Sequence, residues 1–174
     1  MLVQFQYQEL IKRALQEDLG TGDLSSSIFP LSAKTQAKIY AKEEGIVCGL
    51  EITKEVFLTI DPELEIALLY QDGEPVERGQ VVMKIKGRIN SILKGERVAL
   101  NFLQHLSGVA TATNQLVREC EGLPTKITDT RKTLPGLRML QKYAVRMGGG
   151  QNHRFGLYDG VMLKDNHIAA AGGI

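Results

Sequence analysis

The sequence predicts two kinds of fold in one chain: an α+β N-terminal domain, followed by the first βα units of a parallel sheet or barrel. Two observations carry this prediction. Short strand-like and helix-like patterns are mixed over the first part of the chain. After Gly122 and Pro124, a strand pattern, a helical pattern and a second strand pattern follow in order, which is typical of βα units. We place the division between residues 1–107 and 108–174.

The N-terminal elements follow from hydrophobic periodicity. Apolar residues fall on one helical face before Gly20, a natural helix C-terminus. Residues 37–41 alternate between apolar and polar, as in a half-buried strand. The remaining predicted elements are a helix over 52–60 that ends at Asp61 and Pro62, a strand over 63–70, a turn at Asp72 and Gly73, and a strand over 80–86.

A long helical pattern connects the two parts of the chain. It runs over 91–121, and Gly108 interrupts it, so we expect a bend or two helices. A strand over 126–129, a helix over 135–146 and a strand over 160–163 should follow. Since 51 residues come after Leu123 and a complete barrel needs about 200, we expect the barrel to be incomplete in this chain.

Composition restricts the class of protein. Of the 174 residues, 21 are basic and 20 acidic, a net charge of +1, which gives no support for nucleic-acid or membrane binding. No apolar run approaches the roughly 20 residues needed to cross a bilayer. The N-terminal segment carries charge too early for a signal peptide. Cys48 and Cys120 match no metal spacing and are expected to be reduced, buried thiols. We therefore expect a cytoplasmic protein.

Cationic side chains gather between Thr128 and His167, although the whole chain is nearly neutral. The planar guanidinium of arginine can donate two parallel hydrogen bonds to a carboxylate or phosphate, and lysine adds a point charge. The cluster therefore suits a small polyanionic ligand. The segment GGGQNHR lacks the order of a dinucleotide fingerprint, and no zinc spacing or catalytic serine or cysteine arrangement is evident. The cluster consists of Arg131, Lys132, Arg138, Lys142, Arg146, His153, Arg154, Lys164 and His167.

The blocks TDTRKTLPGLR, KYAV, GGGQNHR and LYDGVMLKDNHI closely resemble the quinolinate phosphoribosyltransferase family in order and spacing. The upstream GERVALNFLQHLSGVATAT and EDLGTGDLSS resemble it too. The resemblance implies an α/β-barrel catalytic domain, of which this chain holds the first part. It also implies a pentosyltransferase of NAD biosynthesis. Such an enzyme converts quinolinate and phosphoribosyl diphosphate into nicotinate mononucleotide, pyrophosphate and carbon dioxide.

The resemblance also assigns site residues. It implies that Arg131, His153 and Arg154 line a quinolinate pocket, with Thr130 on the same binding loop. It implies catalytic positions for Lys132 and Lys164, where quinolinate and phosphoribosyl diphosphate meet. It further implies a homodimer with a shared active site, in which Arg97 reaches the partner subunit's site, and leaves a higher oligomer open.

Each assignment has a simpler alternative. From spacing alone, Arg97 could be a surface arginine paired with Glu96, and His153 could cap or brace a loop. Arg138 is a further candidate, as either a ligand contact or a surface residue. His167 is expected to be structural, holding its loop through Asp165 or Asn166.

Magnesium is expected with phosphoribosyl diphosphate, since a diphosphate is a hard oxygen ligand. Its ligands are expected outside this chain, and we assign no metal-binding residue. Residues 1–174 alone are expected to be inactive. The alternatives are a nicotinate-type phosphoribosyltransferase, a non-catalytic fragment or dimerisation module, and a biotinyl or lipoyl carrier module. The carrier alternative rests on DGEPVERGQVVMKIKG, in which Lys84 would carry the cofactor.

Overall fold

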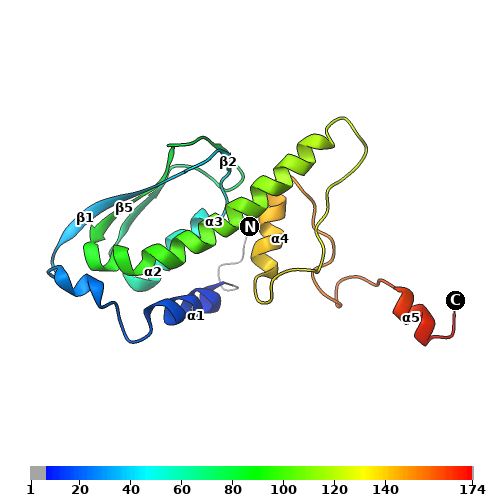
Figure 1. Cartoon of the computed structure of the whole chain (residues 1–174), viewed down its shortest axis with the longest axis horizontal. Helices are drawn as coiled ribbons and strands as arrows, with labels where there is room; N and C mark the ends of the chain where they lie inside the picture. Colours follow the sequence, from blue (N-terminus) through cyan, green and yellow to red (C-terminus); the bar gives the residue numbers. More distant parts are fainter. Residues whose placement is uncertain (1–6, 174) are drawn as a thin grey trace.

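The computed structural model describes residues 7–173 and contains an α+β domain joined by one long helix to a more open C-terminal part (Figure 1). The helices are α1 (Gln8–Leu19), α2 (Leu50–Ile60), α3 (Ile89–Glu119), α4 (Arg138–Met147) and α5 (Asp165–Ala170), with a 3-10 turn η2 (Ser25–Ile28). The strands are β1 (Lys34–Tyr40), β2 (Gly45–Ile46), β3 (Glu65–Leu68), β4 (Pro75–Val76) and β5 (Val81–Arg88).

The main sheet has three antiparallel strands in the order β1-β5-β3. The alternation predicted for the first strand is confirmed, because Ala37 and Ile39 are half-buried while Lys38 and Tyr40 are exposed. Met83 and Ile85 of the central strand are buried. Helices α2 and α3 lie on one side of this sheet (Figure 1), so the core forms between a helix layer and a sheet layer.

Lys84 lies in the middle of the central strand, opposite Lys38 of β1 and Ala67 of β3. A carrier lysine needs the exposed tip of a hairpin, so the carrier alternative is wrong.

The predicted helices of the α+β domain are confirmed. Helix α1 ends where Gly20 takes a positive φ of 49°, a backbone conformation that glycine adopts readily. It buries Ile11 and Leu15 against the core. Helix α2 ends at Ile60, directly before Asp61. The turn at Asp72 and Gly73 is also present.

Of the two outcomes expected at Gly108, a bend or two helices, the second is wrong, because α3 continues through the glycine to Glu119. Tertiary contacts on both sides of the glycine hold the helix. Ser107 accepts a hydrogen bond of 3.0 Å from the Cys48 N–H, and Thr111 accepts one of 2.9 Å from the Ile46 N–H. A glycine costs a helix only about 1 kcal/mol relative to alanine, and these contacts together with the buried Leu106 and Ala110 outweigh that cost.

The two C-terminal strands predicted from the sequence are also wrong. Within 126–129 only Thr128 forms a β-bridge, and its partner is Gln151. Residues 160–163 have no strand structure, and Val161 is 96% exposed. A strand needs a neighbour to pair its backbone groups, and none of residues 7–173 lies beside 160–163 in a ladder.

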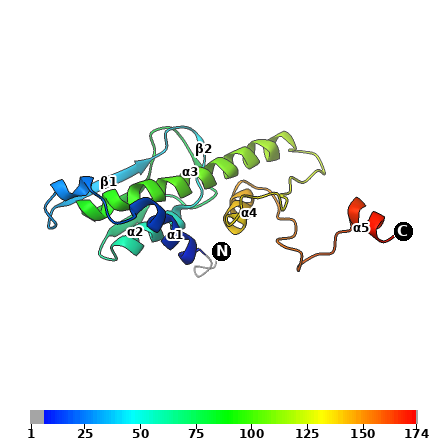
Figure 2. The same cartoon turned by 60° about the horizontal axis from the view of Figure 1, so that its bottom comes forward.

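Helix α4 begins at Arg138, three residues later than predicted, because residues 134–137 form a turn in which Gly136 has a φ of 79°. The predicted role of the triple glycine is confirmed. It follows Met147, the last residue of α4, and a Cβ on Gly148 would lie 2.3 Å from the Ala110 carbonyl oxygen. Only glycine lets this backbone approach α3 so closely. Helix α5 stands apart from the other helices (Figures 1 and 2). None of the helices within residues 7–173 is long and apolar enough to cross a membrane.

Candidate functional site

Two loops from opposite ends of α4 lie side by side and carry most of the predicted site residues. Thr128 and Gln151 form a parallel β-bridge. The Asp129 N–H donates to the Gln151 carbonyl at 3.1 Å, and the Gln151 N–H donates to the Ile127 carbonyl at 2.9 Å. The first loop continues into Thr130, Arg131 and Lys132, and the second into His153 and Arg154. We call them the 129–132 loop and the 151–154 loop.

Helix α4 is anchored to the α+β domain on another side. The Tyr143 hydroxyl donates to Asp72 at 2.8 Å, and Asp72 also accepts the N–H groups of Gly49 and Leu50 at the start of α2. Burial, and then the charge of Asp72, raise the pKa of Tyr143 well above its usual range. Because this hydroxyl stays protonated, it remains a hydrogen-bond donor that joins α4 to the α+β domain.

Arg131 is half-buried, and its guanidinium has an unusual environment. Its Nε is buried and has no hydrogen-bond partner within residues 7–173. A buried donor without an acceptor costs about 1–3 kcal/mol, so the group calls for an explanation. A carboxylate ligand would supply the missing acceptor.

Thr130 and Lys132 are exposed on the same loop. The Thr130 hydroxyl accepts a hydrogen bond of 3.0 Å from the Lys132 N–H. This bond closes a tight turn around Arg131. The Lys132 ammonium makes no ion pair with any described residue, so its charge is available to an anion.

His153 and Arg154 lie on the opposite loop. The His153 Nδ1 accepts the Arg154 N–H at 2.8 Å, so the neutral ring carries its proton on Nε2. His153 is exposed, and Nε2 can therefore donate to a ligand. The Arg154 guanidinium donates to the Gly160 carbonyl at 2.7 Å, which fixes the direction of the half-buried side chain.

Arg138 braces the loops. Its Nε donates to Thr133 at 3.1 Å, and its terminal nitrogens donate to the carbonyls of Phe155 at 3.0 Å and Arg131 at 3.4 Å. The half-buried guanidinium is therefore largely occupied within the protein. It holds the backbone of Arg131 instead of lying free on the surface.

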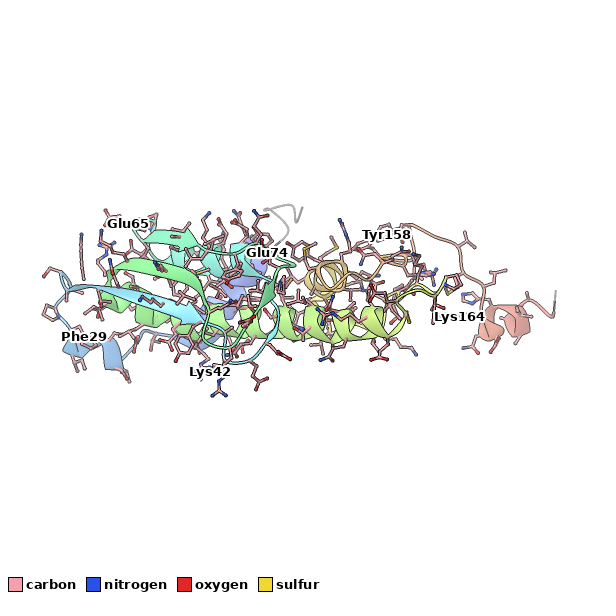
Figure 3. The ribbon with its side chains drawn as sticks, turned by 90° about the horizontal axis from the view of Figure 1, so that it is seen from above. Phe29, Lys42, Glu65, Glu74, Tyr158 and Lys164 are labelled. Atoms are coloured by element: carbon pink, nitrogen blue, oxygen red, sulfur yellow. The ribbon has the colours of Figure 1, made fainter. Side chains whose placement is uncertain are left out.

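Lys164 lies apart from the two loops. Figure 3 shows it beyond the C-terminal end of α3, next to α5. It is exposed, and its N–H donates to the His167 Nδ1 at 3.2 Å. His167 thus has the structural contact expected of it, but through Lys164 instead of Asp165 or Asn166. Within residues 7–173, no hydrogen bond or ion pair joins Lys164 to the 129–132 or 151–154 loop.

Arg97 is exposed on α3 and has no ion pair with Glu96 or any other described residue. The triple-glycine segment contacts α3 near Thr113, which is 16 residues further along the same helix, roughly 24 Å at 1.5 Å per residue. The first turn of α4 contacts the same helix through Gln141 and His105, eight residues after Arg97, and within residues 7–173 no hydrogen bond or ion pair joins Arg97 to either loop.

The described residues offer no metal centre. No group of three or more His, Cys, Asp or Glu side chains within 7–173 is placed to hold a metal ion. A surface depression between α1 and the start of α3 is lined by Asp18, Asp23 and Lys94 among others. It contains none of the predicted site residues, and its two carboxylates do not suit an anionic ligand.

Sequence reasoning missed the residues that hold the loops together. Asp129, Lys142 and Asn152 form a hydrogen-bonded network between them, and Lys142 is completely buried. Lys142 was visible as one cation of the cluster, but charge alone gives no sign of burial. Asp129 and Asn152 each stand beside a predicted site residue, which was the only signal in the sequence.

Two adjoining family models match the chain: the quinolinate phosphoribosyl transferase N-terminal domain over residues 23–107 and the C-terminal domain over residues 109–174. The chain belongs to the quinolinate phosphoribosyltransferase family. The main sheet and α2 fall in the N-terminal family domain, and the two loops fall in the C-terminal one.

Individual relatives agree with this membership. The chain is 50% identical over 169 residues to a probable nicotinate-nucleotide pyrophosphorylase [carboxylating] from Bacillus subtilis, covering 97% of this chain and 58% of that protein. It is 43% identical over 172 residues to a quinolinate phosphoribosyltransferase [decarboxylating] 2b from Nicotiana tabacum, covering 98% and 48%. The chain thus spans about half to three fifths of these relatives.

Solved structures give the same result. A crystal structure of NadC from Streptococcus pyogenes superposes with a TM-score of 0.96 at 45% identity, covering 100% of this chain and 62% of that one. A human nicotinic acid phosphoribosyltransferase superposes with a TM-score of 0.62 at 14% identity, covering 98% and 40%. The second likeness concerns the fold alone.

Proposed function

We propose that this protein transfers the phosphoribosyl group of phosphoribosyl diphosphate to quinolinate, as a carboxylating nicotinate-nucleotide pyrophosphorylase of NAD biosynthesis. The bond between the ribose anomeric carbon and pyrophosphate breaks as the pyridine nitrogen bonds to that carbon. The bond between pyridine C2 and its carboxylate then breaks, carbon dioxide leaves, and C2 takes up a proton. The products are nicotinate mononucleotide, pyrophosphate and carbon dioxide.

The observation that supports this proposal best is the buried, unpartnered Nε of Arg131, opposite a second loop that carries Arg154 and the exposed His153. Two loops with separate cations suit a ligand with two carboxylates. Such a reaction needs little covalent chemistry from the protein, so positioned charge carries the catalysis. Exposed Lys132 would supply a further cation for the substrates, whereas Lys164 lies apart from the two loops and its contribution to the site stays a prediction.

We infer further that residues 108–174 are the first part of an α/β barrel and that 1–107 form the preceding domain. The parallel bridge between Thr128 and Gln151, with α4 between the two residues, supports this inference because it has βαβ topology. Magnesium, as the partner of the diphosphate, and a cytoplasmic location also belong to the proposal. The residues within 7–173 do not form a magnesium site.

Arg131→Ala provides the test. Losing a charge-assisted hydrogen bond costs roughly 1.5–3 kcal/mol, so quinolinate should bind the variant about ten- to a hundredfold more weakly, measured by calorimetric titration of the complete protein. The melting temperature should not fall, because the Arg131 guanidinium has no partner to lose among the described residues. Arg118→Ala, which removes an exposed arginine at the end of α3, is the matched control.

Carbon dioxide release from quinolinate and phosphoribosyl diphosphate is the second readout. We expect release by the wild type with magnesium, and little by Arg131→Ala. Tight binding of nicotinate with no response to quinolinate would instead favour a nicotinate-type phosphoribosyltransferase. Binding of neither compound would overturn the proposal.

A further inference from the structure

The ammonium group of Lys142 is the most enclosed charge in the described part of the C-terminal region. The side chain is 0% exposed. Its Nζ donates to Asp129 Oδ1 and, at 2.9 Å, to the His153 carbonyl, and it lies 4.9 Å from the centre of the Phe155 ring. Lys142 cannot reach a ligand, so its charge acts only on neighbouring protein groups.

Asp129 is the centre of the same network. Its Oδ1 accepts the Lys142 ammonium and, at 2.9 Å, the His153 N–H, while its Oδ2 accepts the Asn152 side-chain amide at 2.5 Å. That amide also donates to the Lys142 carbonyl at 2.8 Å. A buried pair stabilises a structure only when further hydrogen bonds satisfy both charges, and this pair meets the condition.

The network joins the two loops next to the arginines that are predicted to bind the ligand. Asp129 lies two residues before Arg131, and His153 directly precedes Arg154. The Asp129 carboxylate accepts the His153 N–H and the Asn152 amide of the 151–154 loop. The buried ammonium of Lys142 holds both loops to α4 through Asp129 and the His153 carbonyl.

We propose that Lys142, through Asp129, is a positioning residue that sets the spacing of the two loops and thereby favours a dicarboxylate over a monocarboxylate. The inference rests on the proposed function. A ligand with two carboxylates must reach both loops at once, so its affinity depends on their spacing. A ligand with one carboxylate needs only one loop, so its affinity does not.

The experiment is calorimetric titration of the complete protein with quinolinate and with nicotinate. In Lys142→Met, the preference for quinolinate over nicotinate should fall about tenfold or more, while the affinity for nicotinate changes little. General destabilisation would weaken the binding of both ligands in proportion, so the ratio of the two affinities would not change. Lys126→Met, the same substitution at an exposed lysine three residues before Asp129, should keep the wild-type ratio.

Lys142→Met leaves Asp129 buried without its counter-ion, which strongly destabilises proteins. Lys142→Met combined with Asp129→Leu removes both charges and provides a second folded test. It should also lose the preference for quinolinate. A folded single or double variant that keeps the wild-type ratio of quinolinate affinity to nicotinate affinity would overturn the positioning role. It would leave the proposed function standing. A wild type that binds no quinolinate would overturn both.

Discussion

At the scale of single residues, the pKa of Asp61 and its contribution to stability depend mainly on one partner, Arg88. Only 2% of its side chain is exposed, and it accepts hydrogen bonds of 2.8 and 2.7 Å from Arg88. The bonds from the Arg88 guanidinium, more than any other cause, hold the pKa of Asp61 well below its usual range. A carboxyl group with a lowered pKa in the folded state stabilises the fold above its unfolded pKa, about 3.9. That contribution is lost as the pH falls toward the folded value.

Asp61→Asn should lower the free energy of unfolding at pH 7 by about 1–2 kcal/mol, a modest value for a charged hydrogen bond because Arg88 is 43% exposed. The difference between wild type and variant should shrink as the pH falls from 5 to 2, since protonation removes the same charge. Urea denaturation across that range measures it. Glu63→Gln, at a 77% exposed partner of Arg88, should change stability by less than about 0.5 kcal/mol. If the difference in the free energy of unfolding between wild type and Asp61→Asn grew toward low pH, the lowered pKa assigned to Asp61 would be wrong.

At the scale of elements, α3 contains two glycines with different physical roles. Gly95 faces α2, and a Cβ there would lie 2.7 Å from the Phe57 ring and 3.2 Å from Ile60. Gly108 has nothing within 4 Å of the same position. The first glycine permits close helix packing, and the second only raises the cost of helix formation.

The same substitution should therefore have opposite effects in one helix. Gly108→Ala should raise the free energy of unfolding by about 0.5–1 kcal/mol. Gly95→Ala should lower it by about 1–3 kcal/mol, since the fully packed Phe57 ring must move. Thermal or urea denaturation of the two variants tests this directly. Destabilisation by both changes would mean that Gly108 approaches a surface that the described residues do not include.

At the scale of the whole molecule, Arg97 and the two loops lie at different positions along α3. The 31-residue helix fixes Arg97 at a position where no hydrogen bond or ion pair of the described residues joins it to either loop. We propose that the protein is a homodimer in which Arg97 contributes to the partner subunit's active site, which accounts for an exposed, unpaired arginine at this position.

Mixing tests this arrangement in the complete protein. Arg97→Ala and Arg131→Ala should each lack most activity, yet a mixture that exchanges subunits should recover part of it, up to about a quarter of wild type if one site in each hybrid is intact. Purified hybrids, each variant carrying a different affinity tag, would be assayed for carbon dioxide release. If the hybrids are as inactive as the two parent variants, Arg97 does not contribute to the partner subunit's site.

The sequence by itself determined the elements whose signals are local. Periodic apolar residues and terminal glycines placed α1, α2 and the strands of the main sheet, and the motif blocks from Thr128 to His167 identified the family. These features depend on neighbours a few positions away, so one chain segment is enough to predict them.

Tertiary structure alone decided the rest. Helix α3 runs through Gly108 because Ser107 and Thr111 bond to residues about 60 positions away. Residues 160–163 form no strand because a strand depends on a partner. The burial of Lys142 beside Asp129, and of the unpartnered Arg131 Nε, arises from two loops that meet only in space. Burial and hydrogen bonding are properties of an environment, and residues distant in sequence create that environment.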